Sequence, residues 1–81
     1  MLANAARDRL LFIEMNIEQI GEVIRERRDV LGIDQRTLSE ISGVAVHTLS
    51  NIEAGSGNPT VKSLNKVLGA LGMELRVEVQ Q

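Results

Sequence analysis

Glycines divide the middle of this chain into short segments, and their spacing restricts the possible folds more than any other sequence feature. Gly43 separates two short amphipathic segments within residues 34–59, and Gly55 follows the second of them. A left-handed backbone conformation costs glycine little, so one helix can stop and another can start within a tight turn. The pattern is typical of two helices that meet at a sharp angle, one of which projects from the surface. Such a helix fits the major groove of DNA.

The periodicity of the apolar residues predicts four helices, over residues 17–31, 35–42, 46–54 and 61–71. Asn16, Asp34 and Thr60 are good N-capping residues for three of them, whereas Ala45 leaves the helix over residues 46–54 without a cap. One face of the first helix carries Ile17, Ile20, Val23 or Ile24, Arg27 and Leu31. The inward faces of the other helices are expected to carry Leu38, Ile41, Leu49, Ile52, Val61, Leu64, Val67, Leu68 and Leu71.

Composition narrows the fold class and the chemistry. With Phe12 as the single aromatic among 81 residues, Leu, Ile, Val and Ala must build the core, which suits packed helices. The chain has no cysteine and one histidine, so a disulfide or a metal site is not expected, nor is a cofactor. No apolar run approaches the roughly 20 residues of a membrane span. The sequence therefore predicts one small all-α domain in the cytoplasm.

The two ends of the chain differ from its middle. Residues 1–14 form an N-terminal extension that could be a short helix, and Met15 is an alternative start of the protein. Residues 73–81 follow the domain of residues 15–72 and change to a period of two, with Met73, Leu75, Val77 and Val79 alternating with charged residues. This alternation predicts a β-strand, and the same strand of a second copy is its expected partner. A frayed tail is the alternative.

Residues 17–72 contain the segment LGIDQRTLSEISGVAVHTLSNIEAGSGNPTVKSLNKVLGALG. This segment resembles the phage repressor/Cro-type (xenobiotic-response-element) helix-turn-helix regulators. The resemblance is carried by Gln35, Leu38, Gly43, Val44, Thr48, Leu49, Ser50, Ile52, Glu53, Gly55 and Pro59. It implies a lambda repressor-like helical bundle. The strand after the fourth helix is also similar to the HipB-type antitoxin branch, whose members dimerise through such strands.

The resemblance assigns roles to individual residues. It makes the helix over residues 46–54 the recognition helix and places double-stranded DNA against it. The DNA-binding residues it implies are Gln35, Arg36, Val46, His47, Ser50, Asn51, Asn58 and Lys62. It implies a structural ion pair between Arg28 and Glu53 and a dimer through Met73, Leu75, Val77 and Val79.

Two observations point to modest DNA affinity for one copy. Ala45 and Val46 stand where polar residues are usual at the start of the recognition helix, and the formal net charge is −2. A homodimeric repressor on a near-palindromic operator is the favoured function, and an enzyme is not indicated. The alternative is an antitoxin or other protein-interaction module that binds a cognate toxin, with weak or secondary DNA binding.

Overall fold

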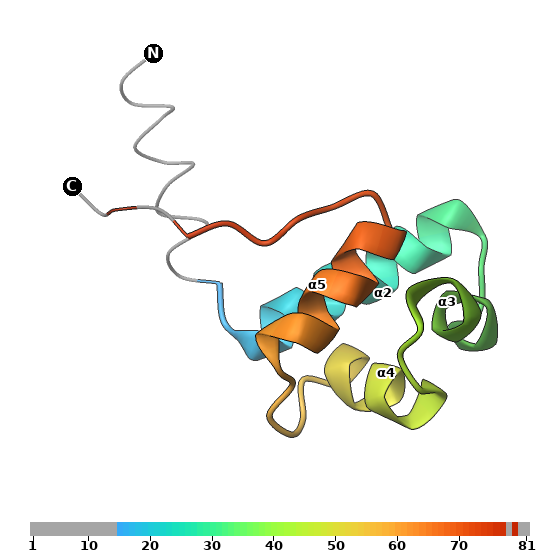
Figure 1. Ribbon diagram of the computed structural model, residues 1–81, viewed down its shortest axis with the longest axis horizontal. Helices are drawn as coiled ribbons and strands as arrows, with labels where there is room; N and C mark the ends of the chain where they lie inside the picture. Colours follow the sequence, from blue (N-terminus) through green and yellow to red (C-terminus); the bar gives the residue numbers. More distant parts are fainter. Residues whose placement is uncertain (1–14, 78, 80–81) are drawn as a thin grey trace, which may run out of the picture.

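The computed structural model describes residues 15–77 and 79, and within them the chain forms four α-helices (Figure 1). These are α2 (Ile17–Leu31), α3 (Gln35–Ser42), α4 (Val46–Glu53) and α5 (Val61–Ala70). The all-α fold class is confirmed, and the predicted helix ends differ from the observed ones by at most one residue. The predicted helical extension over residues 1–14 lies outside the described residues.

Local side-chain chemistry defines where the helices begin. The Asn16 side chain accepts a hydrogen bond from the Gln19 backbone N–H at 2.9 Å, and the Asn16 N–H donates to Gln19 Oε1 at 2.8 Å. This reciprocal capping box satisfies two backbone donors that have no partner within the helix. The Asp34 and Thr60 side chains cap α3 and α5 by each accepting one hydrogen bond from a backbone N–H of the first turn, whereas Ala45 gives α4 no side-chain cap. Gly43 ends α3 with φ at 75°.

A single aliphatic core holds the helices together. Its buried members are Ile24, Leu38, Val44, Leu49, Ile52, Leu64, Val67, Leu68 and Leu71. Helix α4 packs against α2, and α3 packs against both α4 and α5. Arg27 on α2 donates from Nε to the Leu71 carbonyl oxygen at 3.1 Å, so it ties α2 to the C-terminal end of α5.

Two residues expected in the core lie on the surface. Ile41 is 59% exposed and Val61 is 62% exposed. Helix α3 has only eight residues, and Leu38 is the one it buries, so Ile41 lies off the side that packs on α4 and α5. Val61 is the first residue of α5 and precedes the turn that reaches the core. On α2, Ile24 and not Val23 is fully buried, and Leu31 is 45% exposed.

The chain after α5 forms no strand in the part that the structure describes. The Met73 N–H donates to the Leu68 carbonyl at 2.8 Å, and its side chain packs against the core. Beyond it the chain runs out past the helices (Figure 1). A strand needs a neighbour for its backbone groups, and residues 15–77 and 79 contain no second strand to pair with it. Pairing of residues 73–79 between two copies therefore stays a prediction.

None of the described helices is long and apolar enough to cross a membrane.

Candidate nucleic-acid interface

Helix α4 has one buried side and one exposed side. Leu49 and Ile52 are fully buried in the core. On the opposite side Val46, His47, Ser50 and Asn51 are exposed, in two neighbouring rows with a spacing of four residues. The residues that the sequence implied for base contact therefore share one surface. The helix and the loop that follows it lie along the same edge of the molecule (Figure 1).

An ion pair fixes the C-terminal end of α4 to α2. Arg28 donates from Nε to Glu53 Oε2 at 2.8 Å and from Nη2 to Glu53 Oε1 at 2.9 Å. A third hydrogen bond runs from Arg28 Nη1 to the Ile33 carbonyl at 3.0 Å. The side chains are only 15% and 5% exposed, and the hydrogen bond to Glu53 raises the pKa of Arg28. Glu53 lies in the last turn of its helix, where the helix dipole disfavours a negative charge. The charged Glu53 carboxylate is therefore stabilised mainly by Arg28.

Gln35 makes a contact that the sequence did not reveal. Its side-chain amide donates from Nε2 to Glu53 Oε1 at 3.2 Å, and the residue is half-buried. The resemblance implied a phosphate contact for Gln35, yet in this structure its amide N–H faces the ion pair. The two residues are eighteen positions apart, so no local pattern could have indicated the contact. Glu53 thus joins α2, α3 and α4.

The other candidate DNA-binding residues lie around α4 on neighbouring elements. Arg36 is exposed on the first turn of α3, Asn58 is exposed in the loop before α5, and Lys62 is exposed on the first turn of α5. Within residues 15–77 and 79, ion pairs form at Arg28 and Arg76 and not at Arg36 or Lys62. Both cations are therefore available to an external anion. Among the same residues no group of three or more His, Asp or Glu side chains could hold a metal ion.

The fold and this surface are those of a helix-turn-helix protein, and comparison with known families agrees. The helix-turn-helix family model matches residues 24–77, which is more than half of the chain. The chain therefore belongs to this family, of the xenobiotic-response-element type. The HipB-type branch stays a prediction.

A curated relative is described as an uncharacterized HTH-type transcriptional regulator of Haemophilus influenzae. The two are 36% identical over 63 residues, which cover 78% of this chain and 63% of the relative. The chain thus spans less than two thirds of the relative's length.

Proposed function

We propose that this protein is a transcriptional repressor that binds operator DNA as a homodimer and inserts α4 into the major groove. The observation that carries the proposal is the exposed surface of α4, whose buried side is anchored by Leu49, Ile52 and the Arg28–Glu53 pair. A rigidly held helix can present side chains to base edges in a fixed register. Family membership and the relative's description support the same class of function.

The exposed α4 side chains offer a mixed set of base contacts. The Asn51 amide carries both a donor and an acceptor, which suits the N6 and N7 edge of adenine. His47 can donate to guanine or to a phosphate. Val46 can only pack against a thymine methyl group. With so few polar groups on each copy, two copies are needed for useful specificity.

Contacts to the DNA backbone are assigned to residues around α4. Arg36, Lys62 and Asn58 fit this role because each is exposed on an element that flanks the helix. Gln35 can contribute through its backbone N–H at the start of α3, since its side chain bonds to Glu53. In a dimer, Arg36 and Lys62 of the two copies would neutralise about four phosphates. The logarithm of the binding constant, plotted against the logarithm of the salt concentration, would then have a slope of about −4.

The dimer would place its two α4 helices in successive major grooves, about 34 Å apart, on a near-palindromic site. Bound there, it would block transcription from the adjacent promoter. Such a role requires a cytoplasmic protein.

Selection of binding sites from random DNA by the full chain tests the proposal. We expect enrichment of a two-fold symmetric site. Asn51→Ala should lower affinity for that site by roughly tenfold or more, given 1–3 kcal/mol for each good base contact. Asn65→Ala removes another exposed amide, from α5, and is the matched control. Absence of any enriched sequence would refute sequence-specific binding.

Arg36→Ala should weaken binding to all sequences alike and make the salt slope less steep by about 1 for each copy. Arg25→Ala on α2 is the control, since it changes the net charge equally from another helix. An unchanged slope would remove Arg36 from the interface.

A second candidate is a protein-interaction module of the antitoxin type. Two observations favour it: the Gln35 amide bonds to Glu53, and α4 begins without a cap at Ala45. If the double variant His47→Ala/Asn51→Ala kept full DNA affinity, α4 would not read DNA, and this candidate would replace the repressor.

A further inference from the structure

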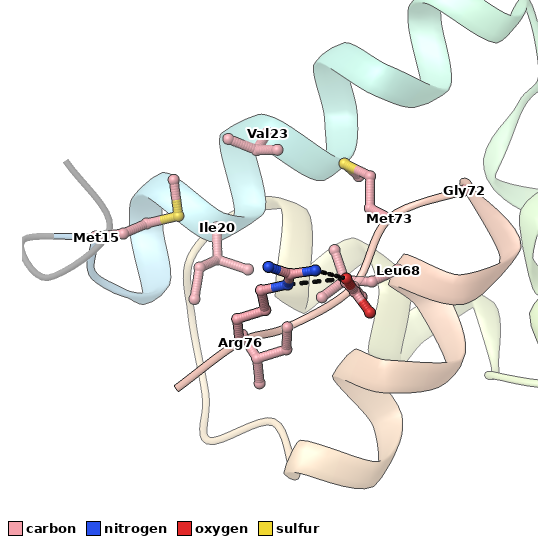
Figure 2. A pocket seen from close by; sticks show the side chains of 9 residues that line it. Met15, Ile20, Val23, Leu68, Gly72, Met73 and Arg76 are labelled. Carbon is pink, nitrogen blue, oxygen red and sulfur yellow. Dashed lines mark hydrogen bonds and ion pairs between the residues drawn. The ribbon is translucent and has the colours of Figure 1, made fainter. Parts of the chain in front are cut away.

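An apolar groove lies between the first half of α2, the end of α5 and the chain that follows. Its volume is about 740 Å³. Apolar side chains from all three segments line it, and Glu74 and Arg76 stand with them (Figure 2). These apolar residues are Met15, Ile20, Val23, Leu68, Met73 and Leu75. None of the residues that line the groove belongs to the proposed DNA surface on α4 and the elements that flank it.

Within the part of the chain that the structure describes, the tail carries two apolar side chains that are largely exposed. Leu75 lines the groove, whereas Val77 is 96% exposed and Val79 is 82% exposed. In a β-strand, residues two apart point to the same side, so a strand formed on pairing with a partner would bring Leu75, Val77 and Val79 into one apolar row. Val77 and Val79 are not among the residues that line the groove. The two valines therefore lie outside the groove of their own chain.

The charges beside the groove suit a second copy of the same surface. Arg76 Nη2 lies 2.9 Å from Glu74 Oε1, and the two side chains are 69% and 68% exposed. An ion pair so exposed adds little to the stability of one chain. Replacing it with ion pairs between two copies therefore costs little free energy. A surface that carries one positive and one negative group can pair with itself across a two-fold axis, because each group meets its opposite.

We infer that the groove is filled by the tail of a second copy, with Val77 and Val79 of each chain packed against Ile20 and Val23 of the other. This inference rests on the proposed homodimer and extends its interface from the tail to α2 and α5. The Glu74 and Arg76 side chains then pair between copies at the edge of the groove.

Single-cysteine variants provide a direct test, because the chain has no cysteine of its own. Two variants of the full chain, Val23→Cys and Val77→Cys, are prepared so that their masses differ and the mixed product can be recognised. They are then mixed and mildly oxidised. Neither variant can form an intrachain disulfide, so a mixed disulfide reports contact between copies. We expect the yield of this mixed disulfide to be at least ten times the yield obtained when Val77→Cys is mixed with Val30→Cys. Val30 is 75% exposed at the other end of α2 and is the matched control.

A second measurement does not depend on cysteine chemistry. Val23→Glu should raise the dimer dissociation constant in sedimentation by at least tenfold, whereas Val30→Glu should leave it unchanged. Circular dichroism of both variants would show whether the fold is kept.

The outcomes separate the inference from the proposed function. Dimers in which Val77→Cys couples only with itself would show tail-to-tail pairing and overturn the groove assignment while the homodimer stands. A monomer, including one whose own residues 1–14 occupy the groove, would overturn both the inference and the homodimer. Operator selection would still decide DNA binding by itself.

Discussion

Gly21 on α2 lies directly against the backbone of α4. A Cβ atom at this position would collide with the Ile52 carbonyl oxygen and would lie 3.1 Å from the Glu53 carbonyl oxygen. Both are backbone atoms of α4, so neither can move without displacing the helix. The absence of a side chain at Gly21 therefore determines how close the candidate recognition helix lies to α2.

Gly21→Ala is expected to lower the free energy of unfolding by about 1–3 kcal/mol, because the added methyl overpacks the contact. Gly69→Ala is the control: it is also inside a helix, and nothing lies within 4 Å of the added Cβ. That substitution should be neutral or stabilise by up to about 1 kcal/mol. Urea denaturation measures both, and equal effects would contradict the close approach.

Glu53 accepts hydrogen bonds from both Arg28 and Gln35, and its side chain is 5% exposed. Removing one partner of a buried pair leaves the other charge without compensation. Glu53→Gln is therefore expected to cost about 3 kcal/mol. Glu74→Gln breaks an ion pair that is 68% exposed and should cost less than about 1 kcal/mol. Thermal unfolding of the two variants, compared at pH 7, tests whether burial makes the difference.

At the scale of the element, α3 is defined by its two ends. Asp34 caps it, and Gly43 stops it with a left-handed backbone. Short-range interactions of this kind involve residues three or four positions apart, and they explain why the predicted helix ends were close to the observed ones. Short-range interactions do not determine which side of a helix is buried. The buried side depends on the neighbouring helices, and so Ile41 and Val61 were wrongly placed in the core.

The cap of α3 should make stability depend on pH. Hydrogen bonds from the Thr37 backbone N–H and hydroxyl lower the pKa of Asp34 below its ordinary 3.8. A carboxyl with a lowered pKa in the folded state stabilises the protein when charged. This contribution is present above pH 3.8 and is lost as the pH falls through the lower, folded-state pKa.

Asp34→Ser keeps a capping oxygen without the titrating group, so it should retain the helix and lose this part of the pH dependence. Asp34→Ala should lose both the cap and the dependence. Urea denaturation between pH 2 and pH 7 measures the difference. If the free energy of unfolding fell equally steeply at acid pH in the parent and in the serine variant, other carboxyl groups would be the cause of that fall.

At the scale of the whole molecule, the described helices make a closed core but leave Val77 and Val79 in solvent. Val77→Glu should therefore leave the unfolding of one chain unaffected and raise the dimer dissociation constant by roughly tenfold, equivalent to about 1.4 kcal/mol. Operator affinity should fall with it, because each half-site is then bound by a separate copy. Val30→Glu, at a site 75% exposed, is the control. Analytical ultracentrifugation combined with gel-shift titration measures both quantities, and an undisturbed dimer would remove the tail from the interface.

The sequence alone determined the order, type and ends of the four helices, because caps, glycines and apolar spacing act over a few residues. It also led to the helix-turn-helix class, since the residues of that motif are close together in the chain. Only the tertiary structure decided that Gln35 turns to Glu53, that Ile41 is exposed and that α2 and α4 meet at Gly21. These features depend on contacts between residues far apart in the chain, such as Gln35 and Glu53 or Gly21 and Ile52, and such contacts exist only once the core has brought the helices together.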